Sequence, residues 1–488
     1  MSKEKIGSRK NLVVNDFSKS FQANENFEEN FFTDLAFNLN TKTKVIKKGL
    51  GIAQFKVPTT FAVGSEEILL DTSSLNLSQI NNVLYFKQYF PESNNTQHRI
   101  LLHGSDNKLY VHQMYCGVGS LLSTYQLEFN SAPICLSYKL DGKDTIILSS
   151  PEKMVVWTTD LAPYTVEDVP IITSMSISDG VLWCTIDGEA NKIWYCLSLN
   201  PELIGVSTDT TKYLSLDDER GYARKVLTFK ENLYAFRDYG ITRINLYSPA
   251  EITTTQVYLS DSKIYADTIT SCGDVIMFMT RDGIYSFNGV NVTKQNIGIE
   301  KFLTCDNSNA IGACLQDKWY LGLHLNFADD KQIMCEANDF INNALLVINL
   351  DDYSFEIMRG VDIKTMMPLK TDTLEKMLVT FNTGEIDKVG EIDESGKLFG
   401  ENTYKCLVSN TIYADSLESM IIRNITLHSS ANVCVKIITN NSMYNFVTSV
   451  DGINKFQTII PCGNFKIEIG TNTEDIDLKY LDIEYFKK

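Results

Sequence analysis

One arrangement recurs along the middle of this sequence and constrains its fold more than any other feature. A short apolar strand is followed by a turn containing Gly, Asp or Asn, and then by a second strand rich in aromatic residues. Clear examples are RILLHGSDNKLYVH, VLWCTIDGEANKIWYCL, NLYAFRDYGITRI and VIMFMTRDGIYSF, at residues 99–112, 181–197, 232–244 and 275–287. Helical periodicity is scarce by comparison, so the chain is predicted to be all-β.

The spacing of these hairpins predicts a closed, repetitive architecture. From the turn near Gly104 to the turn near Gly384 the intervals average about 47 residues, which is the spacing of propeller blades. A lone hairpin is only marginally stable and an open strand edge invites aggregation, so repeated four-stranded sheets are expected to close into a ring. We therefore predict a β-propeller of about six to eight blades at residues 52–398.

The strand pattern changes after residue 398 and predicts a separate C-terminal β-sandwich at residues 399–488. Short strands such as SMIIRNITLH, NVCVKIIT and FKIEIG are separated by Asn, Ser and Gly turns. In the last strand the apolar phase slips by one residue between Tyr480 and Leu481. A β-bulge there would return the following side chains to the core, and two short strands broken by a bend are the alternative.

The first 51 residues show little strand alternation and are interpreted as an extended N-terminal arm at residues 1–51. Its phenylalanines are too numerous for a solvated tail, so they are expected to pack on the propeller or on another subunit. Its lysines indicate either contact with an acidic partner or DNA, or a solvated turn. The candidate partner-binding residues are Phe17, Phe21, Phe27, Phe31, Phe32, Lys42, Lys44, Lys47 and Lys48. Removing residues 1–40 is expected to leave a folded propeller.

No motif for catalysis or for cofactor or metal binding is found in the sequence. It has no GxGxxG opening a helix, no phosphate-binding GxxxxGK[ST] loop and no GxSxG element. The eleven cysteines include no CxxC pair, and Cys184 and Cys196, which flank a hairpin turn, are interpreted as two thiols. We therefore assign no catalytic, cofactor-binding or metal-binding residue and expect no enzymatic activity.

The residues that most resemble functional groups have simpler interpretations. His98, His103 and His112 alternate between the faces of expected strands, and no further ligand completes a metal site. Residues 176–183 nearly match a sialidase-type Asp box, but the Asp is displaced by one position, which favours an ordinary hairpin turn. The acidic run at 217–219 is expected on a solvated loop.

Charge is unevenly distributed along the chain. The formal net charge is −17, with +3 in residues 1–50 and −20 in the remainder. An acidic body repels the phosphate backbone at long range, which argues against tight nucleic-acid binding over the whole surface. The N-terminus lacks the pattern of a secretory signal and no apolar run is long enough to span a bilayer, so a cytosolic chain without membrane insertion is expected.

The order of these parts resembles that of the tail hub or nozzle proteins of short-tailed bacteriophages, also called packaged-DNA stabilisation proteins. The resemblance rests on a basic segment ending in KGLG at 48–51, and on the blade phrases LTFKENLYAFRDYGITRI, MTRDGIYSFNGVNVTK and LLVINLDDYSFEIMRGV before the terminal sandwich. It implies a structural virion protein that is assembled in the host cytoplasm. No family motif fixes a binding residue at a position of this sequence.

In that family the subunits form a homo-oligomeric ring, typically a hexamer, below the portal and its adaptor. The ring extends the DNA channel, touches phage DNA transiently and non-specifically, and helps to retain packaged DNA until ejection. The resemblance implies the same partners here, namely the portal, the adaptor and other tail proteins. An acidic body agrees with this role, because an acidic or neutral lining lets a polyanion slide.

Other classes of propeller remain as alternatives. A carbohydrate-binding or glycoside-hydrolase-like propeller would need an aromatic platform, or two carboxylates about 5 to 9 Å apart that face a central funnel. A cytosolic interaction scaffold would need neither feature.

Overall fold

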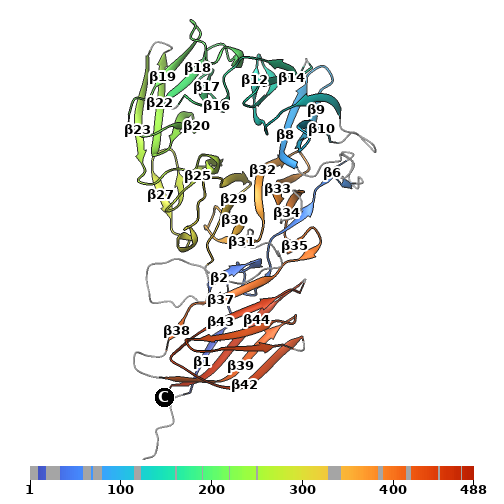
Figure 1. Cartoon of the computed structure of the whole chain (residues 1–488), viewed down its shortest axis with the longest axis vertical. Helices are drawn as coiled ribbons and strands as arrows, with labels where there is room; N and C mark the ends of the chain where they lie inside the picture. The colour runs from blue at the N-terminus through green and yellow to red at the C-terminus, as the bar shows by residue number, and fades with distance from the viewer. Residues whose placement is uncertain are drawn as a thin grey trace, which may run out of the picture.

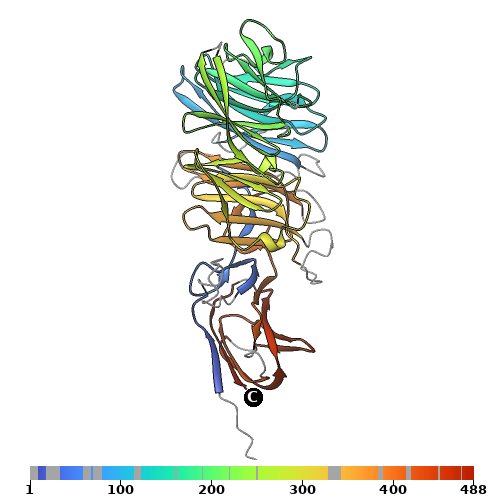
Figure 2. The ribbon, with the colours of Figure 1, turned by 90° about the vertical axis from the view of Figure 1, so that its left-hand side faces the viewer.

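The computed structural model describes most of the chain as an all-β protein. The described residues are 9–17, 33–58, 67–69, 80–114, 123–159, 162–189, 191–218, 220–248, 251–327, 342–382, 388–413, 419–448, 451–473 and 475–487. A ring of sheets lies at one end of the long axis and a smaller pair of sheets at the other (Figures 1 and 2). Helix within these ranges is limited to the 3-10 turns Pro201–Leu203, Ala266–Thr268 and Glu300–Phe302. None of the helices in the described part could cross a membrane.

The ring is a seven-bladed β-propeller, which confirms the predicted fold class. Each of the first six blades is a four-stranded antiparallel sheet whose strands follow one another in sequence. Blades 1 to 3 comprise β8 (Ile80–Phe90), β9 (Asn95–Gly104), β10 (Lys108–Gln113), β11 (Ser123–Glu128), β12 (Ile134–Leu140), β13 (Lys143–Ser149), β14 (Met154–Thr158), β15 (Tyr164–Val166), β16 (Ile172–Ser178), β17 (Val181–Ile186), β18 (Lys192–Cys196) and β19 (Thr211–Ser215). Blades 4 to 6 comprise β20 (Ala223–Phe229), β21 (Asn232–Arg237), β22 (Gly240–Ser248), β23 (Glu251–Leu259), β24 (Thr270–Cys272), β25 (Val275–Thr280), β26 (Gly283–Phe287), β27 (Val292–Gln295), β28 (Ile311–Leu315), β29 (Lys318–His324), β30 (Asn343–Asn349) and β31 (Phe355–Arg359).

The seventh blade joins the two ends of the propeller sequence. Three strands come from the end of the repeat, β32 (Asp362–Lys370), β33 (Glu375–Asn382) and β34 (Lys388–Asp393). The fourth is β5 (Gly51–Gln54), which precedes the first blade and pairs antiparallel with β34. The same sheet continues through β35 (Lys397–Leu398) and β36 (Glu401–Asn402). Because the closing strand comes from the other end of the sequence, the ring has no open blade edge at this point.

The propeller core lies between neighbouring blades. Each interface between two adjacent blades contains its own buried apolar cluster, and the series runs from blades 1 and 2 round to blades 7 and 1. At the interface of blades 4 and 5, for example, Phe236 packs edge-on against Phe278, with ring centroids 5.9 Å apart. Edge-to-face packing of aromatic rings adds to the stabilisation from apolar burial. Aromatic residues of the repeated hairpins therefore contribute, with aliphatic residues, to the contacts between blades.

The second domain is a β-sandwich of two sheets that enclose a single core. The first sheet has the order β1 (Arg9–Val14), β44 (Leu478–Lys487), β39 (Met420–Ser429) and β42 (Gly452–Cys462). The second has the order β2 (Thr33–Phe37), β37 (Lys405–Ser409), β43 (Asn464–Thr471), β40 (Cys434–Thr439) and β41 (Met443–Val447), with β38 (Ile412–Tyr413) also paired to β43. The predicted bulge in β44 is present, because His428 pairs with Tyr480 and the next residue, Ser429, with Leu478.

The prediction of an extended arm at residues 1–51 is wrong, because two N-terminal strands belong to the sandwich. β1 pairs with β44 from Arg9 opposite Phe486 to Val14 opposite Leu481, and β2 pairs with β37. Only Val14 among the six residues of β1 is buried, so the segment has no alternating pattern. Its partner strand lies at the opposite end of the chain, and a local sequence pattern cannot reveal such a pairing.

Two small ribbons complete the N-terminal part. One consists of β3 (Leu39–Asn40) and β4 (Lys47–Lys48), and the other of β6 (Lys56–Pro58) and β7 (Glu67–Leu69). Together with β5, they carry the chain from the sandwich into the propeller.

Candidate functional site

A buried contact around Phe37 joins the propeller to the sandwich. The Phe37 ring is fully buried and lies 6.1 Å from the ring of Phe327 and 6.4 Å from that of Tyr404. The guanidinium of Arg359, at the end of blade 6, lies 4.9 Å from the Phe37 ring and 4.1 Å from the Phe327 ring. A cation over aromatic faces is attracted most strongly where water is excluded. This contact, which we call the joint, therefore combines apolar burial with an electrostatic attraction.

Asn38 adds three hydrogen bonds to the joint. Its Nδ2 donates to the carbonyl of Tyr404 (2.7 Å), and its Oδ1 accepts from the backbone NH of Arg359 (3.0 Å). Its own backbone NH donates to the carbonyl of Ile357 (2.7 Å). The residue has a φ of 58°, a left-handed conformation that asparagine tolerates better than most residues. One side chain thus links the N-terminal segment, blade 6 and the start of the sandwich.

The four candidate lysines have two different environments. Lys42 forms an ion pair with Glu356 of blade 6 (3.2 Å), and Lys48 forms one with Asp475 of the sandwich (2.7 Å). Burial raises the pKa of Glu356, and the positive charge of Lys42 opposes this shift. Lys44 and Lys47 are exposed. Lys42 therefore connects the N-terminal segment to the propeller and Lys48 pairs with the sandwich, which leaves Lys44 and Lys47 as the exposed members of the predicted set.

The candidate phenylalanines are only partly covered by the structure. Phe17 is fully buried in the core of the sandwich, alongside Val14 and Leu39. Its assignment as a partner-binding residue is therefore wrong, because the ring packs inside its own chain and only the fold shows that a strand precedes it. Phe21, Phe27, Phe31 and Phe32 lie outside the described residues.

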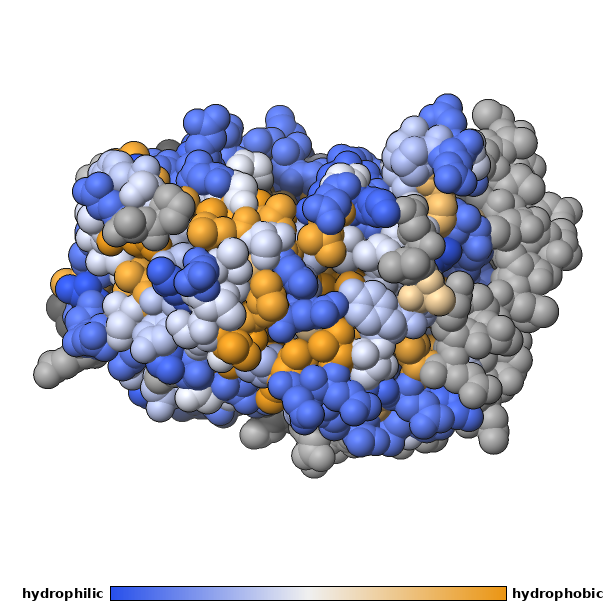
Figure 3. All heavy atoms as spheres, turned by 90° about the horizontal axis from the view of Figure 1, so that it is seen from above, coloured by the Kyte–Doolittle hydropathy of each residue, from blue (hydrophilic) through white to orange (hydrophobic). Residues whose placement is uncertain are grey.

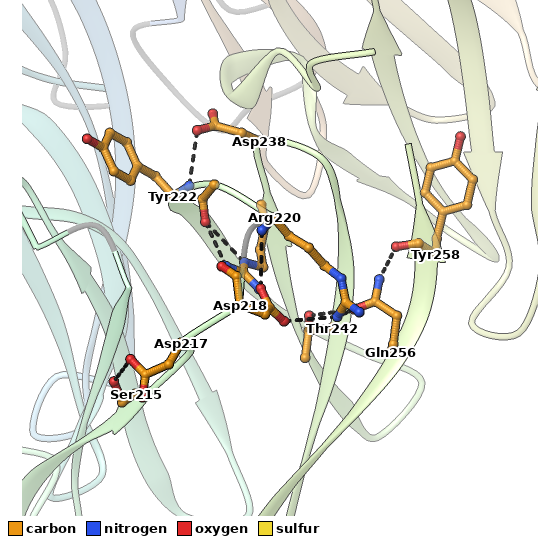
Figure 4. Close-up of polar contacts among 11 residues, drawn as sticks. Ser215, Asp217, Asp218, Arg220, Tyr222, Asp238, Thr242, Gln256 and Tyr258 are labelled. Carbon is orange, nitrogen blue, oxygen red and sulfur yellow. Dashed lines mark hydrogen bonds and ion pairs between the residues drawn. The ribbon is translucent and has the colours of Figure 1, made fainter. Parts of the chain in front are cut away.

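A second feature is the charged loop that links blade 3 to blade 4 (Figure 4). Arg237, at the end of β21, is fully buried although it is charged. It is ion-paired with Asp218, and it donates from Nε (3.2 Å) and Nη2 (2.8 Å) to the carbonyl of Gly221. Asp218 also accepts from Nη1 of Arg220 (2.9 Å), and Arg220 in turn contacts Gln256 of β23. Asp218 is exposed on this loop, as expected from the sequence, and two arginines fix its position.

The loop is held against blade 4 at one position that requires glycine. Gly221 has a φ of 77°, and a Cβ at this position would lie 2.6 Å from the Cβ of Asp238. That close approach lets the Asp238 carboxylate accept from the backbone NH of Tyr222 (3.0 Å) and from Nε of Arg224 (2.9 Å). Of the other acidic residues in the run, Asp217 is exposed and accepts from the hydroxyl of Ser215, and Glu219 lies outside the described residues.

Beside this loop lies a pocket of about 620 Å³ at blades 4 and 5. Its walls come from the turn after β21, the connection from β23 to β24, the turn after β25 and the connection from β27 to β28. The charged lining residues are Arg224, Asp238, Asp261, Lys263, Asp267, Arg281 and Asp306. Asp306 is shared with a smaller pocket of about 250 Å³ that also includes His324 and Lys364. Both signs of charge are present, so the pocket can contact a polar or charged group of a partner.

The lining of the larger pocket shows no arrangement for nucleophilic catalysis. Its described lining residues include no histidine or cysteine. No group of three or more His, Cys, Asp or Glu side chains in the described ranges is placed to hold a metal ion.

Among the histidines singled out from the sequence, His98 Nδ1 lies 2.8 Å from the Tyr85 hydroxyl and His103 Nε2 lies 2.8 Å from the Phe129 carbonyl. Burial lowers the pKa of His112.

Cys184 and Cys196 are buried free thiols, and burial raises the pKa of Cys184. The thiolate is the reactive form of cysteine, so this environment makes Cys184 unreactive.

The residues that sequence reasoning missed are Asn38, Arg237 and Arg359. Each has partners in another segment of the chain, and nothing in its local pattern distinguishes it from an ordinary surface residue.

Replacing Arg237 with alanine is expected to lower the free energy of unfolding by about 2–3 kcal/mol, because the Gly221 carbonyl loses its buried donors and a cavity forms. Arg243, which is exposed on the next strand of the same blade, provides the control, and Arg243→Ala should change the value by less than about 0.5 kcal/mol. Urea unfolding of both variants checks this. Equal stabilities would show that the buried arginine does not organise the loop.

No known protein-family model and no curated protein sequence matches the chain. Solved structures resemble part of the chain. The AfRom2 CNH domain aligns with 64% of this chain and 96% of its own length, at 10% identity and a TM-score of 0.38. BBS1N, from a complex with ARL6DN, aligns with 62% of this chain and 89% of its own, at 9% identity and a TM-score of 0.37. Hsv2 of Kluyveromyces lactis aligns with 58% and 97%, at 9% identity and a TM-score of 0.31. These similarities are too distant to carry a functional inference.

Proposed function

We propose that this chain is a structural tail hub or nozzle subunit of a short-tailed bacteriophage. Several copies form a ring below the portal and its adaptor, extend the DNA channel and help to retain packaged DNA until ejection. The proposal rests on the sequence resemblance described above. Of the parts that the resemblance implies, a propeller followed by a sandwich is present, whereas the N-terminal segment contributes β1 and β2 to the sandwich. On this proposal the chain acts in the virion tail and is assembled in the host cytoplasm.

The structural observation that supports the proposal best is the joint. A ring subunit that surrounds a channel must keep its domains at a fixed angle, and a flexible linker could not do so. Here Phe37 and Asn38 are buried between the domains, and the ion pair of Lys42 with Glu356 ties the N-terminal segment to blade 6. In Figure 2 the propeller and the sandwich lie one above the other along the long axis, with the N-terminal segment (blue) between them.

The surface of the propeller favours assembly through specific contacts rather than non-specific hydrophobic association. Seen from the propeller end, apolar areas are interrupted by hydrophilic residues (Figure 3). The net charge of −17 makes copies repel each other at long range. We therefore expect the ring to form on an adaptor surface that fixes the spacing of the subunits.

The proposal is tested by mixing the purified chain with the portal–adaptor complex of its phage and imaging the product by negative stain. The expected result is an added ring of density below the adaptor that contains several copies of the chain. A complex that never acquires this density, together with virions that lack the protein yet hold DNA and infect normally, would overturn the proposal.

Association with the adaptor complex is expected to be slowed when Lys44 and Lys47 are both changed to glutamate. These two lysines are exposed, and a rim charge acts mainly on the association rate through long-range attraction to an acidic partner. We expect a decrease of about tenfold in the rate at low salt and a smaller decrease at high salt. The control reverses two exposed propeller lysines, Lys108 and Lys212. Equal rates for both double variants would exclude a role for this segment in docking.

A further inference from the structure

Two cysteines meet at the interface of blades 5 and 6. Cys272 is the last residue of β24 in blade 5, and Cys314 lies in β28 in blade 6. Cys272 is buried in the apolar cluster between these two blades, and Cys314 packs against the same cluster. Both are free thiols, and their side chains are hydrogen-bonded to each other. The two sulfur atoms therefore lie close together although they belong to different blades.

The strand that carries Cys314 directs it toward blade 5. Side chains two residues apart in a strand point to the same face, so Gly312 and Cys314 share one face of β28. A Cβ at Gly312 would lie 2.8 Å from the carbonyl of Thr268, in the turn before β24, so this face is turned toward blade 5. The residue between them, Ala313, belongs to the cluster of blades 6 and 7 on the opposite side. The backbone thus places Cys314 beside Cys272 independently of the contact between the thiols.

The two thiols differ in reactivity. Cys272 is 4% exposed, whereas Cys314 is partly exposed. The Cys272 thiol donates to the sulfur of Cys314, which lowers the pKa of Cys314 and, together with burial, raises the pKa of Cys272. The thiolate is the nucleophilic form, so Cys314 is the thiol that reacts first. Burial raises the pKa of four other described cysteines, Cys135, Cys184, Cys305 and Cys462.

We propose that Cys272 and Cys314 form a reversible disulfide between blades 5 and 6, with a small-molecule disulfide such as oxidised glutathione as the oxidant. The Cys314 thiolate attacks one sulfur of oxidised glutathione, forms a mixed disulfide and releases one glutathione thiolate, which takes the proton of Cys272. The Cys272 thiolate then attacks the Cys314 sulfur and releases the second glutathione as a thiolate. The two cysteines lose two electrons, and these reduce one oxidised glutathione to two glutathione molecules.

This bond adds a covalent connection at the part of the ring that contacts the sandwich. The cluster that contains Cys272 also contains Leu35 and Phe37 of β2 and Cys406 of β37. A disulfide restricts the unfolded chain and thereby stabilises the folded one, so the oxidised protein is expected to melt about 5 °C higher than the reduced protein. The inference goes beyond the proposed function and does not depend on it.

The test is incubation of the purified full chain with excess oxidised glutathione, followed by alkylation of the remaining thiols and mass spectrometry without reduction. Digestion with trypsin and with a protease that cleaves before aspartate separates Cys314 from Cys305, because Asp306 lies between them. A peptide pair that joins Cys272 to Cys314 is expected from more than about half of the chains. Dithiothreitol should release both peptides, and circular dichroism should show the same fold before and after oxidation.

Single substitutions test the order of the two steps. Cys272→Ala should leave Cys314 joined to one glutathione, whereas Cys314→Ala should leave Cys272 unmodified. Cys184→Ala is the control, because Cys184 is a buried thiol in blade 3, and it should leave the yield of the Cys272–Cys314 pair unchanged. Glutathione attached to Cys272 in the Cys314→Ala protein would contradict the assigned order.

The unsubstituted chain decides the proposal without any variant. If the folded protein gives no Cys272–Cys314 peptide pair in excess oxidised glutathione, or gives it only after unfolding in urea, the two thiols are not an oxidation site. No phage component is present in these experiments, so their failure would leave the tail-hub proposal to its own test.

Discussion

A chain that lacks residues 1–40 is expected to have an unfolded sandwich and a folded propeller. The deletion removes β1 and β2, which are edge strands of the two sheets, and with them Phe17 and Phe37, which are both fully buried. The propeller keeps its closing strand, because β5 begins at Gly51. Hydrogen exchange should show lost protection in β39 and β43 and retained protection in β17. The folded propeller is the same as expected from the sequence, and the structure adds the expected unfolding of the sandwich.

Point substitutions separate the effect of burial from that of chain length. Phe17→Ala is expected to lower the free energy of unfolding of the sandwich by about 3–5 kcal/mol, the usual cost of truncating a buried aromatic ring. Val13→Ala provides the control in the same segment, because Val13 is 47% exposed, and it should cost less than about 0.5 kcal/mol. If the deletion leaves β39 and β43 fully protected, then the N-terminal strands are not part of the sandwich core.

The parts of the fold that could be predicted from the sequence are those with local repetition. Each of the first six blades consists of consecutive antiparallel strands, so the signal for a hairpin lies within about 15 residues and recurs around the ring. The bulge in β44 was likewise visible as a phase slip between Tyr480 and Leu481 in a single strand. Local patterns of this kind determine the architecture of most of this chain.

The parts that could not be predicted depend on partners far away in the sequence. β1 pairs with a strand more than 460 residues later, and the joint brings Asn38 next to Arg359. Arg237 is the only charged residue of its strand, β21, and its partner Asp218 belongs to the preceding loop. Long-range pairings of this kind leave no periodic pattern in the sequence. For the same reason the sequence does not distinguish Lys42 and Lys48, which form ion pairs within the chain, from the exposed Lys44 and Lys47.

The most damaging single substitution is expected at the point where the propeller closes. Ile52, in β5, is fully buried between blades 6 and 7. It pairs with Ile392 on one side and Leu398 on the other, and its carbonyl accepts from the NH of Phe399 (2.8 Å). Ile52→Asp would place an unpaired carboxylate in this core, and we expect a loss on the order of 5 kcal/mol.

The reason for so large an effect is that the closing strand connects the two ends of the ring. If β5 detaches, β34 gains an open edge and the clusters on both sides of blade 7 are exposed, so the cost extends beyond one side chain. Ile52→Val keeps the apolar contact and should cost only about 0.5–1.5 kcal/mol, whereas Lys56→Asp adds a carboxylate at an exposed position nearby and should cost less than about 0.5 kcal/mol. Urea unfolding followed by tryptophan fluorescence measures all three, since the four tryptophans lie in propeller strands. An Ile52→Asp protein that unfolds at the same urea concentration as the unmodified chain would show that β5 does not close the propeller.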